Sequence, residues 1–255
     1  MKSTRVFGGI AAWVVLSAAG ASGAATLRVS AASSLTEAFG TIAEMFEASH
    51  PGTEVELNFG GSQILRTQIE QGAPVDVFAA ADLAQMEPLE KAALVGAPRV
   101  FAHNELVAVA STKSGKVKGL GELARPGIRI VVAGETVPVG RYTMQLLAKM
   151  NAAGLWGDDF QARFGANVVS RETNVRAVLA KVSLGEADAG IVYRTDVAAA
   201  EGVTVLDIPS RWNVIATYPI AVVSRTESPD LAEELVELVT GADGQAILRR
   251  HGFLE

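Results

Sequence analysis

The sequence predicts an α/β protein built from two lobes. The composition is that of an ordinary globular chain, since 49% of the 255 residues are hydrophobic and 20% are charged, which excludes a mainly disordered state. Short apolar strands alternate with amphipathic helices along the chain, a pattern typical of α/β folds with mostly parallel sheets. The number of these units beyond the first 25 residues is enough for two lobes.

The first half of the chain shows three strand–helix units. Residues 27–31 (LRVSA) are a short strand candidate, and residues 55–59 alternate between apolar and polar side chains, so both are predicted strands. A third strand is predicted at the apolar segment 75–80. Apolar residues at helical spacing predict helices over 35–48, 64–71 and 86–93, and Gly72 ends the second of them.

The second half continues the alternation. Apolar runs predict strands over 106–110, 128–133, 189–193 and 218–223. Helical spacing predicts helices over 142–150, 175–184 and 231–239. Gly154 and Gly185 follow the first two of these helices and are typical stop signals.

The amino-terminal segment has the pattern of a secretory signal peptide. Lys2 and Arg5 precede an apolar run over 6–19, and small residues follow up to Ala25. We therefore expect a cleaved signal peptide over residues 1–25 and export to the periplasm. The alternative is a membrane anchor, because residues 6–27 carry no charge, although a spanning helix needs about 20 strongly apolar residues. A lipid-anchored lipoprotein is excluded because the chain contains no cysteine.

Charge and cysteine content exclude several classes of function. The formal net charge is −6, which is unfavourable for a nucleic-acid-binding protein. Without cysteine there is no disulfide framework, no thiolate nucleophile and no cysteine-bound zinc. His50, His103 and His251 lie far apart in sequence and lack the spacing of metal ligands, so we expect no cation site.

The most informative pattern is the way four helices begin. The predicted starts are Ser33-Ser34, Gly60-Gly61-Ser62, Val137-Pro138-Val139-Gly140 and Thr173-Asn174-Val175. Strand-to-helix turns of an α/β sheet lie at the carboxyl ends of strands, where ligands bind. Helix amino termini carry unpaired N–H groups and a partial positive charge. Several termini directed at one point would therefore bind an anion.

Each of these features also has a structural explanation. Ser34 begins an S-x-x-E capping box and would then only cap its helix. Gly60 and Gly61 supply turn geometry, Ser62 is an ordinary cap residue, and Tyr193 is a core tyrosine in this reading.

Catalytic motifs are mostly missing from the sequence. There is no G-x-S-x-G nucleophile elbow and no phosphate-binding P-loop motif. An exported hydrolase with Ser34 or Ser62 as nucleophile stays as an alternative, but it requires a nearby histidine base. No histidine lies close to either serine in sequence.

Several segments together resemble a known family. They are AASSLTEAF (31–39), NFGGSQILRTQIEQGAPVDVFAAAD (58–82), VPVGRYTMQLL (137–147), ETNVRAVLAKVSLGEADAGIVYRTD (172–196), YPIAVV (218–223) and GQAILRRHGF (244–253). In order and spacing they resemble the periplasmic molybdate-binding proteins of ABC importers. The resemblance covers essentially the whole chain after the signal peptide.

The resemblance implies a fold and a function. The fold is the type II periplasmic binding protein fold, in which two Rossmann-like lobes are joined by two crossing strands, here near 104–110 and 217–223. Lobe one would comprise 26–106 plus 221–255, and lobe two 107–220. The protein would bind molybdate, and also tungstate, and deliver it to the membrane permease of an ABC importer. It would act as a monomer that does not span the membrane, without catalysis, cofactor or nucleic acid.

The resemblance also implies a ligand set. Two serine hydroxyls, two backbone N–H groups and one tyrosine hydroxyl hold the oxyanion, and the motifs place them at Ser34, Ser62, Val139, Val175 and Tyr193. Molybdenum would thus be bound as its oxyanion and not at a cation site. Members of the family often have alanine at the position of Val139 and a serine-richer turn at Gly60-Gly61. These departures keep another tetrahedral oxyanion, such as sulfate, as an alternative ligand.

Four arginines follow closely behind the predicted ligand positions. They are Arg66, Arg141, Arg176 and Arg194. They would either steer a dianion toward the site electrostatically or lie as exposed arginines on their helices, and the sequence leaves both readings open.

Overall fold

The structure is a computed structural model that describes residues 25–198 and 200–255. The predicted signal peptide lies outside the described residues, except for Ala25. The strands are β1 (Ala25–Ala32), β2 (Thr53–Gly60), β3 (Val77–Ala79), β4 (Arg99–Ser111), β5 (Ile130–Ala133), β6 (Val168–Glu172), β7 (Ala189–Tyr193), β8 (Val203–Asp207) and β9 (Ile215–Val222). The α-helices are α1 (Thr36–Ser49), α2 (Ser62–Glu70), α3 (Leu83–Lys91), α4 (Pro138–Ala152), α5 (Phe160–Ala166), α6 (Val175–Leu184), α7 (Pro229–Thr240) and α8 (Ala242–Arg250). Short 3₁₀ helices are η1 (Ser33–Leu35), η2 (Leu120–Ala124) and η3 (Arg194–Val197).

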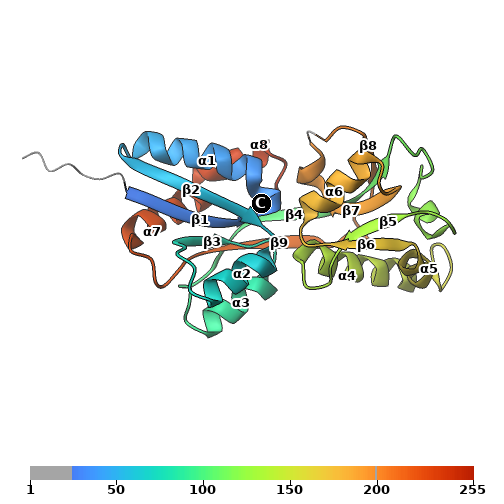
Figure 1. The fold of residues 1–255 in the computed structure, drawn as a ribbon, viewed down its shortest axis with the longest axis horizontal. Helices are drawn as coiled ribbons and strands as arrows, with labels where there is room; N and C mark the ends of the chain where they lie inside the picture. The colour runs from blue at the N-terminus through green and yellow to red at the C-terminus, as the bar shows by residue number, and fades with distance from the viewer. Residues whose placement is uncertain (1–24, 199) are drawn as a thin grey trace, which may run out of the picture.

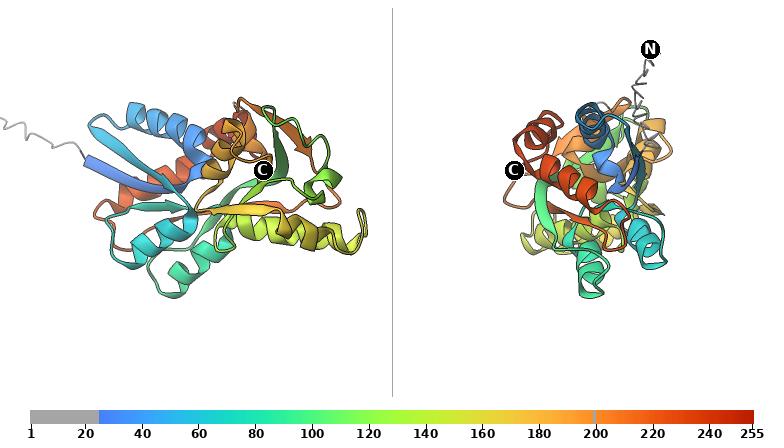
Figure 2. Two further views of the ribbon diagram at one scale, coloured as in Figure 1. Left: turned by 45° about the vertical axis from the view of Figure 1, so that its right-hand side comes forward. Right: turned by 90° about the vertical axis from the view of Figure 1, so that its left-hand side faces the viewer.

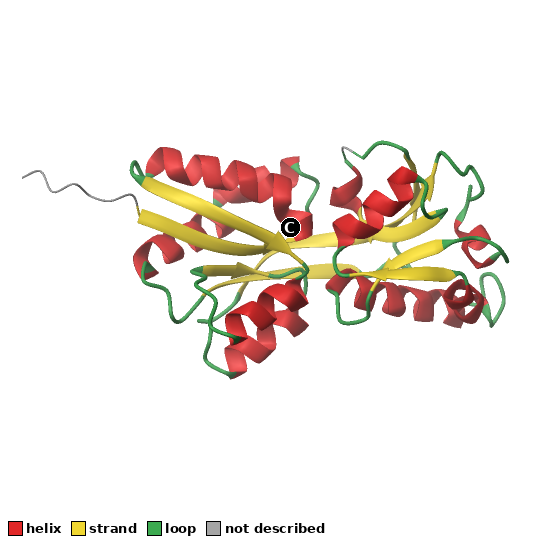
Figure 3. Cartoon of the chain, viewed as in Figure 1, coloured by secondary structure: helices red, strands yellow, loops and turns green. Residues whose placement is uncertain are grey.

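The elements form two groups that are joined by β4 and β9 (Figure 1). One group contains β1–β3 with α1–α3, α7 and α8, and the other contains β5–β8 with α4–α6. Helices flank the strands of each group on both faces (Figure 3) and surround them when the molecule is viewed along its long axis (Figure 2). This is the predicted α/β architecture of two lobes with two crossing strands.

The sheet order is β2-β1-β3-β9-β4-β7-β5-β6, with β8 paired to β4. The expectation of mostly parallel sheets is wrong, because four of the eight pairings are antiparallel. The cause is the pair of crossing strands. β9 runs antiparallel to β3, and β4 runs antiparallel to β7, β8 and β9.

The long strand β4 changes partner along its length. Residues 99–105 pair with β9, and residues 106–110 pair with β7. The apolar sequence of its second half predicts only 106–110, because the first half is more polar and partly exposed. β6, β8, α5 and α8 are absent from the predicted set. β6 and β8 are exposed or half-buried along their length, so neither shows the apolar run of a buried strand.

Buried side chains hold the helices against the sheet. Phe39, Ile42 and Phe46 of α1 are each 1% exposed, and they contribute about 1.5–3 kcal/mol each through removal of apolar surface from water. α4 begins at Pro138, four residues before the periodic apolar pattern that predicts it, because proline suits the first turn of a helix.

Close backbone approach requires glycine at the start of α4. A Cβ atom on Gly140 would lie 2.0 Å from the carbonyl oxygen of Gly134 and 2.6 Å from that of Ala133. Gly40, within α1, has no heavy atom within 4 Å of the corresponding position.

We therefore expect Gly140→Ala to lower the free energy of unfolding by about 1–3 kcal/mol, because α4 must shift. The matched variant Gly40→Ala should raise it by about 0.5–1 kcal/mol, because alanine loses less backbone entropy in a helix. Urea denaturation of both variants measures these changes. Equal effects of the two substitutions would contradict the close approach at Gly140.

Candidate anion-binding site

A small cavity lies where the four predicted helix starts meet. Its empty volume, which includes space open to solvent, is about 200 Å³. Its lining includes all five residues that the sequence places at the anion site: Ser34, Ser62, Val139, Val175 and Tyr193. These residues are between 1% and 4% exposed. The cavity therefore suits a small, largely desolvated ligand.

Two backbone N–H groups at the cavity are left unpaired by helix geometry. Val139 is the second residue of α4 and follows Pro138, which has no N–H. Val175 is the first residue of α6, where the Asn174 side chain accepts from Ala177 N instead. Within residues 25–198 and 200–255, no protein group accepts the N–H of Val139 or Val175. Both helix starts thus offer donors and a partial positive charge to the cavity.

The two serines are not helix caps. The 3₁₀ helix at Ser33 and the helices α1 and α2 have no side-chain cap hydrogen bond, so the capping interpretation of Ser34 and Ser62 is wrong. Ser34 Oγ lies 3.0 Å from the Tyr218 hydroxyl, and Ser62 Oγ accepts from Ala81 N at 3.1 Å. Their positions are set by contacts to β9 and to the segment after β3.

The Tyr193 hydroxyl is the buried donor that most clearly marks the cavity as a binding site. Tyr193 is the last residue of strand β7 and is buried. Its hydroxyl has no hydrogen-bond partner among the described residues. An unsatisfied buried polar group costs about 1–3 kcal/mol. Burial holds the pKa of Tyr193 well above its ordinary value, so the hydroxyl keeps its proton and is available as a donor.

The four arginines near the ligand positions are paired with carboxylates, and none of them lines the cavity in the part of the chain that the structure describes. Arg176 bridges to Glu37 and lies 3.0 Å from Asp196, although that nitrogen and oxygen are not aligned for a hydrogen bond. The other pairs are Arg66–Glu70 at 3.4 Å, Arg141–Asp82, Arg194–Glu105 at 2.6 Å and Arg194–Asp207 at 2.8 Å. The cavity therefore offers hydrogen-bond donors without a cationic side chain in its wall.

Several contacts close the cavity by joining the two groups of elements. Gln63 Nε2 of α2 donates to Thr173 O at 2.8 Å, and Gln85 Nε2 of α3 donates to Thr136 O at 3.1 Å. The ion pairs Asp82–Arg141 and Glu37–Arg176 cross between the same groups. A Cβ atom on Gly61 would lie 2.2 Å from Thr173 O, so this approach needs glycine.

Sequence reasoning missed several polar residues behind the cavity. Tyr218 bonds Ser34, and Asn104 Nδ2 donates to Tyr218 at 3.4 Å. Asp196, which is 3% exposed, accepts from Tyr193 N at 3.2 Å. A single sequence gives no signal for these side chains, because each lies in an apolar segment or next to one and is placed by tertiary packing.

The histidines give no support for serine catalysis. His50 Nε2 bonds Glu234, His103 bonds Thr217, and His251 bonds Thr41. In the described residues neither Ser34 nor Ser62 is hydrogen-bonded to a histidine, as a nucleophile with a general base requires. The described residues also contain no group of three or more histidine or carboxylate side chains placed for a metal ion.

Comparison with known proteins places these features in context. Residues 27–254 match the family of bacterial extracellular solute-binding proteins. The molybdate-binding protein ModA of Mycobacterium tuberculosis is 42% identical over 234 residues, which cover 91% of this chain and 85% of that protein. The Azotobacter vinelandii periplasmic molybdate-binding protein has a similar fold, with a TM-score of 0.76, 24% identity, and coverage of 90% of this chain and 99% of that one.

The same fold occurs around another anion. The sulfate-binding protein SubI from Mycobacterium tuberculosis aligns with a TM-score of 0.78 at 17% identity, covering 90% of this chain and 86% of that one. None of the helices in residues 25–198 and 200–255 combines the length and the apolar character that a membrane span requires.

The buried carboxyl of Asp196 generates a pH prediction. Burial raises its pKa to about 7, while the Arg176 charge and the Tyr193 N–H act in the opposite direction. Because the unfolded chain ionises near pH 4 and the folded chain only near pH 7, this group lowers the free energy of unfolding as pH rises from 4 to 7. Asp196→Asn removes that titration. The stability of the variant relative to wild type should therefore increase from pH 4 to pH 7 and then level off, as measured by urea denaturation. A difference that does not change with pH would contradict the raised pKa.

Proposed function

The chain belongs to the bacterial extracellular solute-binding proteins, among the molybdate-binding proteins, and from this premise we propose that it captures molybdate, and also tungstate, for an ABC importer. The observation that carries the proposal is the cavity between the two groups of elements, where buried donors have no acceptor among the described residues. As a solute-binding protein it binds and releases its ligand and is not an enzyme. No cofactor takes part, and the permease of the importer is the partner.

The proposed ligand set is Ser34 Oγ, Ser62 Oγ, Val139 N, Val175 N and the Tyr193 hydroxyl. All five donate hydrogen bonds, which suits molybdate and tungstate because these dianions carry no proton at neutral pH. Phosphate near pH 7 carries at least one proton. That proton would face a donor, and a buried polar group left unsatisfied costs about 1–3 kcal/mol.

Sulfate stays as a second candidate ligand. It is also an unprotonated dianion, and the fold is shared with a sulfate-binding protein. The donors alone therefore do not separate sulfate from molybdate, and the separation has to come from the size of the cavity. Val139 lines the cavity, and we propose that its side chain, larger than the alanine that the resemblance leads us to expect there, acts on this size.

We further propose that the chain closes on the anion as two lobes. Lobe one is 26–106 plus 221–255, lobe two is 107–220, and β4 and β9 connect them. Each lobe supplies part of the ligand set, with Ser34 and Ser62 from lobe one and Val139, Val175 and Tyr193 from lobe two. Binding would then hold the lobes together through the anion.

Export fits the family, whose members are extracellular. We propose that residues 1–25 contain a cleaved signal peptide that sends the chain to the periplasm, where it acts as a monomer. Cleavage after Ala24 would keep all of β1, because this strand begins at Ala25. It would also keep the nitrogen of Ala25, which donates to Gly52 O at 2.9 Å.

Calorimetry of the mature protein at pH 7 with molybdate, tungstate, sulfate and phosphate tests the proposal. We expect molybdate and tungstate to bind most tightly, and phosphate to bind more than tenfold more weakly than molybdate because of its proton. Saturation at 100 times the dissociation constant should add about 2.7 kcal/mol to the free energy of unfolding. No heat and no thermal stabilisation with millimolar molybdate would contradict the proposed function, and preference for sulfate would select the second candidate.

Substitution of the serines tests the ligand set. Ser34→Ala and Ser62→Ala each remove a hydrogen bond to a charged group, worth about 1.5–3 kcal/mol, so the dissociation constant for molybdate should rise about 10- to 150-fold. Ser111→Ala is the matched control, because Ser111 is also buried and its hydroxyl has no partner in the described residues. It ends β4 away from the cavity. If all three variants bind molybdate like wild type, the two serines are not ligands.

A further inference from the structure

The Oγ atoms of Ser34 and Ser62 each lie within hydrogen-bond distance of another protein group. Ser62 Oγ accepts from the backbone N–H of Ala81, a group that has no other role than donor. Ser62 therefore keeps its own proton for the cavity. The contact of Ser34 with the Tyr218 hydroxyl is ambiguous by itself, because either oxygen is able to donate.

Asn104 resolves the direction of the bond between Ser34 and Tyr218. Its Oδ1 accepts from Glu105 N at 2.9 Å, which identifies the other terminal atom as the amide nitrogen. This Nδ2 donates to Thr195 Oγ1 at 2.8 Å and to the Tyr218 hydroxyl oxygen at 3.4 Å. An amide nitrogen cannot accept. Among the described residues, Asn104 Nδ2 and Ser34 Oγ are the two groups within hydrogen-bond distance of the Tyr218 hydroxyl. Because Nδ2 cannot accept, the buried Tyr218 proton is satisfied only if Ser34 Oγ accepts it.

From this chain of hydrogen bonds we propose that Tyr218 and Asn104 are positioning residues that hold Ser34 as a donor toward the anion and so select oxyanions without a proton. The proposal rests on the proposed function. It adds to the site two side chains that act through Ser34 and do not touch the ligand. Ser34 reaches the same state through Tyr218 as Ser62 reaches through Ala81 N.

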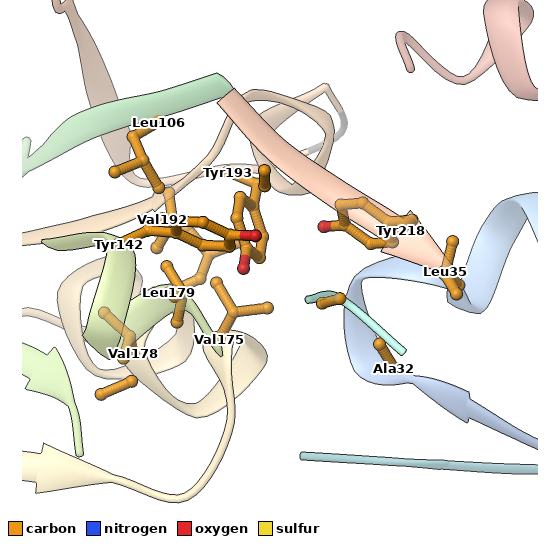
Figure 4. Packing of buried hydrophobic residues seen from close by; sticks show 14 of the residues in the cluster. Ala32, Leu35, Leu106, Tyr142, Val175, Val178, Leu179, Val192, Tyr193 and Tyr218 are labelled. Carbon is orange, nitrogen blue, oxygen red and sulfur yellow. The ribbon is translucent and has the colours of Figure 1, made fainter. Parts of the chain in front are cut away.

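The surroundings of Tyr218 keep its hydroxyl in place. Tyr218 and Asn104 are both 0% exposed and lie on the two crossing strands, β9 and β4. The Tyr218 ring packs edge-on against Phe101, Tyr193 and Phe253, with centroid distances of 6.2, 5.8 and 5.5 Å. Figure 4 shows the Tyr218 hydroxyl directed from β9 toward the side that holds Tyr193. Burial raises the pKa of Tyr218, so the hydroxyl stays protonated and continues to donate.

The selectivity follows from which lone pairs remain free. With Tyr218 donating to Ser34, one of the two Ser34 lone pairs is occupied and the Ser34 proton is available to the anion. We infer that the hydroxyl then meets the proton of hydrogen phosphate as a competing donor. Without the Tyr218 hydroxyl, Ser34 Oγ is free to turn and accept that proton. Loss of the hydrogen bond from Tyr218 to Ser34 should therefore weaken the binding of molybdate more than the binding of phosphate.

The test compares wild type, Tyr218→Phe, Ser34→Ala and the double variant at pH 7. Calorimetry gives the dissociation constant for molybdate, and displacement of molybdate gives the constant for phosphate. We expect Tyr218→Phe to raise the dissociation constant for molybdate about tenfold and to change that for phosphate little. The ratio of the phosphate constant to the molybdate constant should therefore fall about tenfold. When Tyr218→Phe is added to Ser34→Ala, this ratio should stay unchanged within about twofold, because Tyr218 acts on the ligand through Ser34.

A merely structural role would give a different pattern. Both oxyanions would then weaken in parallel, and the effect of Tyr218→Phe would persist in the Ser34→Ala background, which would overturn the proposal. If Tyr218→Phe fails to fold, Asn104→Leu takes its place. This substitution nearly keeps the side-chain volume and removes the donor to Tyr218, so it should also lower the ratio of the phosphate constant to the molybdate constant. If the wild-type protein binds no molybdate, the proposed function itself is overturned. If it binds molybdate and the variants leave the ratio of the two constants unchanged, only the proposed role of Tyr218 and Asn104 is overturned.

Discussion

An anion that leaves water must find a hydrogen-bond donor for each oxygen that faces the protein, and this requirement organises the molecule. Four strand-to-helix turns converge on one cavity. At the starts of α4 and α6, the backbone N–H groups of Val139 and Val175 line this cavity without an acceptor among the described residues. The arginines close behind these turns are each paired with a carboxylate. The cavity wall thus presents helix-start N–H groups and hydroxyls, and no cationic side chain among the described residues lines it.

Closure depends on the same elements. The two glutamines Gln63 and Gln85 donate to backbone carbonyls across the cavity, and Gly61 permits the approach of Thr173 O. The crossing strands β4 and β9 carry Asn104 and Tyr218, so the side chains that orient Ser34 sit where the lobes join. A movement of the lobes would therefore act on the orientation of a ligand as well as on access to it. This coupling gives the two crossing strands a chemical role beyond connection.

Local sequence was sufficient for the α/β class and for the convergence of helix starts. Strands and helices alternate clearly in the apolar pattern, and the turns at Ser34, Ser62, Val139 and Val175 stand out by their small or helix-entry residues. Local sequence did not show β6 or β8, since both are exposed or half-buried along their length and lack the apolar run of a buried strand. It also misjudged Ser34, because S-x-x-E satisfies a capping pattern whether or not the hydroxyl caps. The contact with Tyr218, 184 residues away, decides that question and is invisible to a local pattern. The proposal of Tyr193 as a ligand comes from the resemblance to molybdate-binding proteins, because periodicity alone assigns this residue to the core.

The most direct measurement of the central claim is a crystal structure of the mature protein with molybdate, with anomalous scattering recorded at the molybdenum absorption edge. The account predicts one molybdenum peak inside the cavity, with its oxygens within hydrogen-bond distance of the hydroxyls of Ser34, Ser62 and Tyr193 and of the N–H groups of Val139 and Val175. A peak beside Arg176 and His251, in the neighbouring cavity lined by the ion pair to Glu37, would contradict it, because a charged side chain would then bind the anion in place of the donors described above.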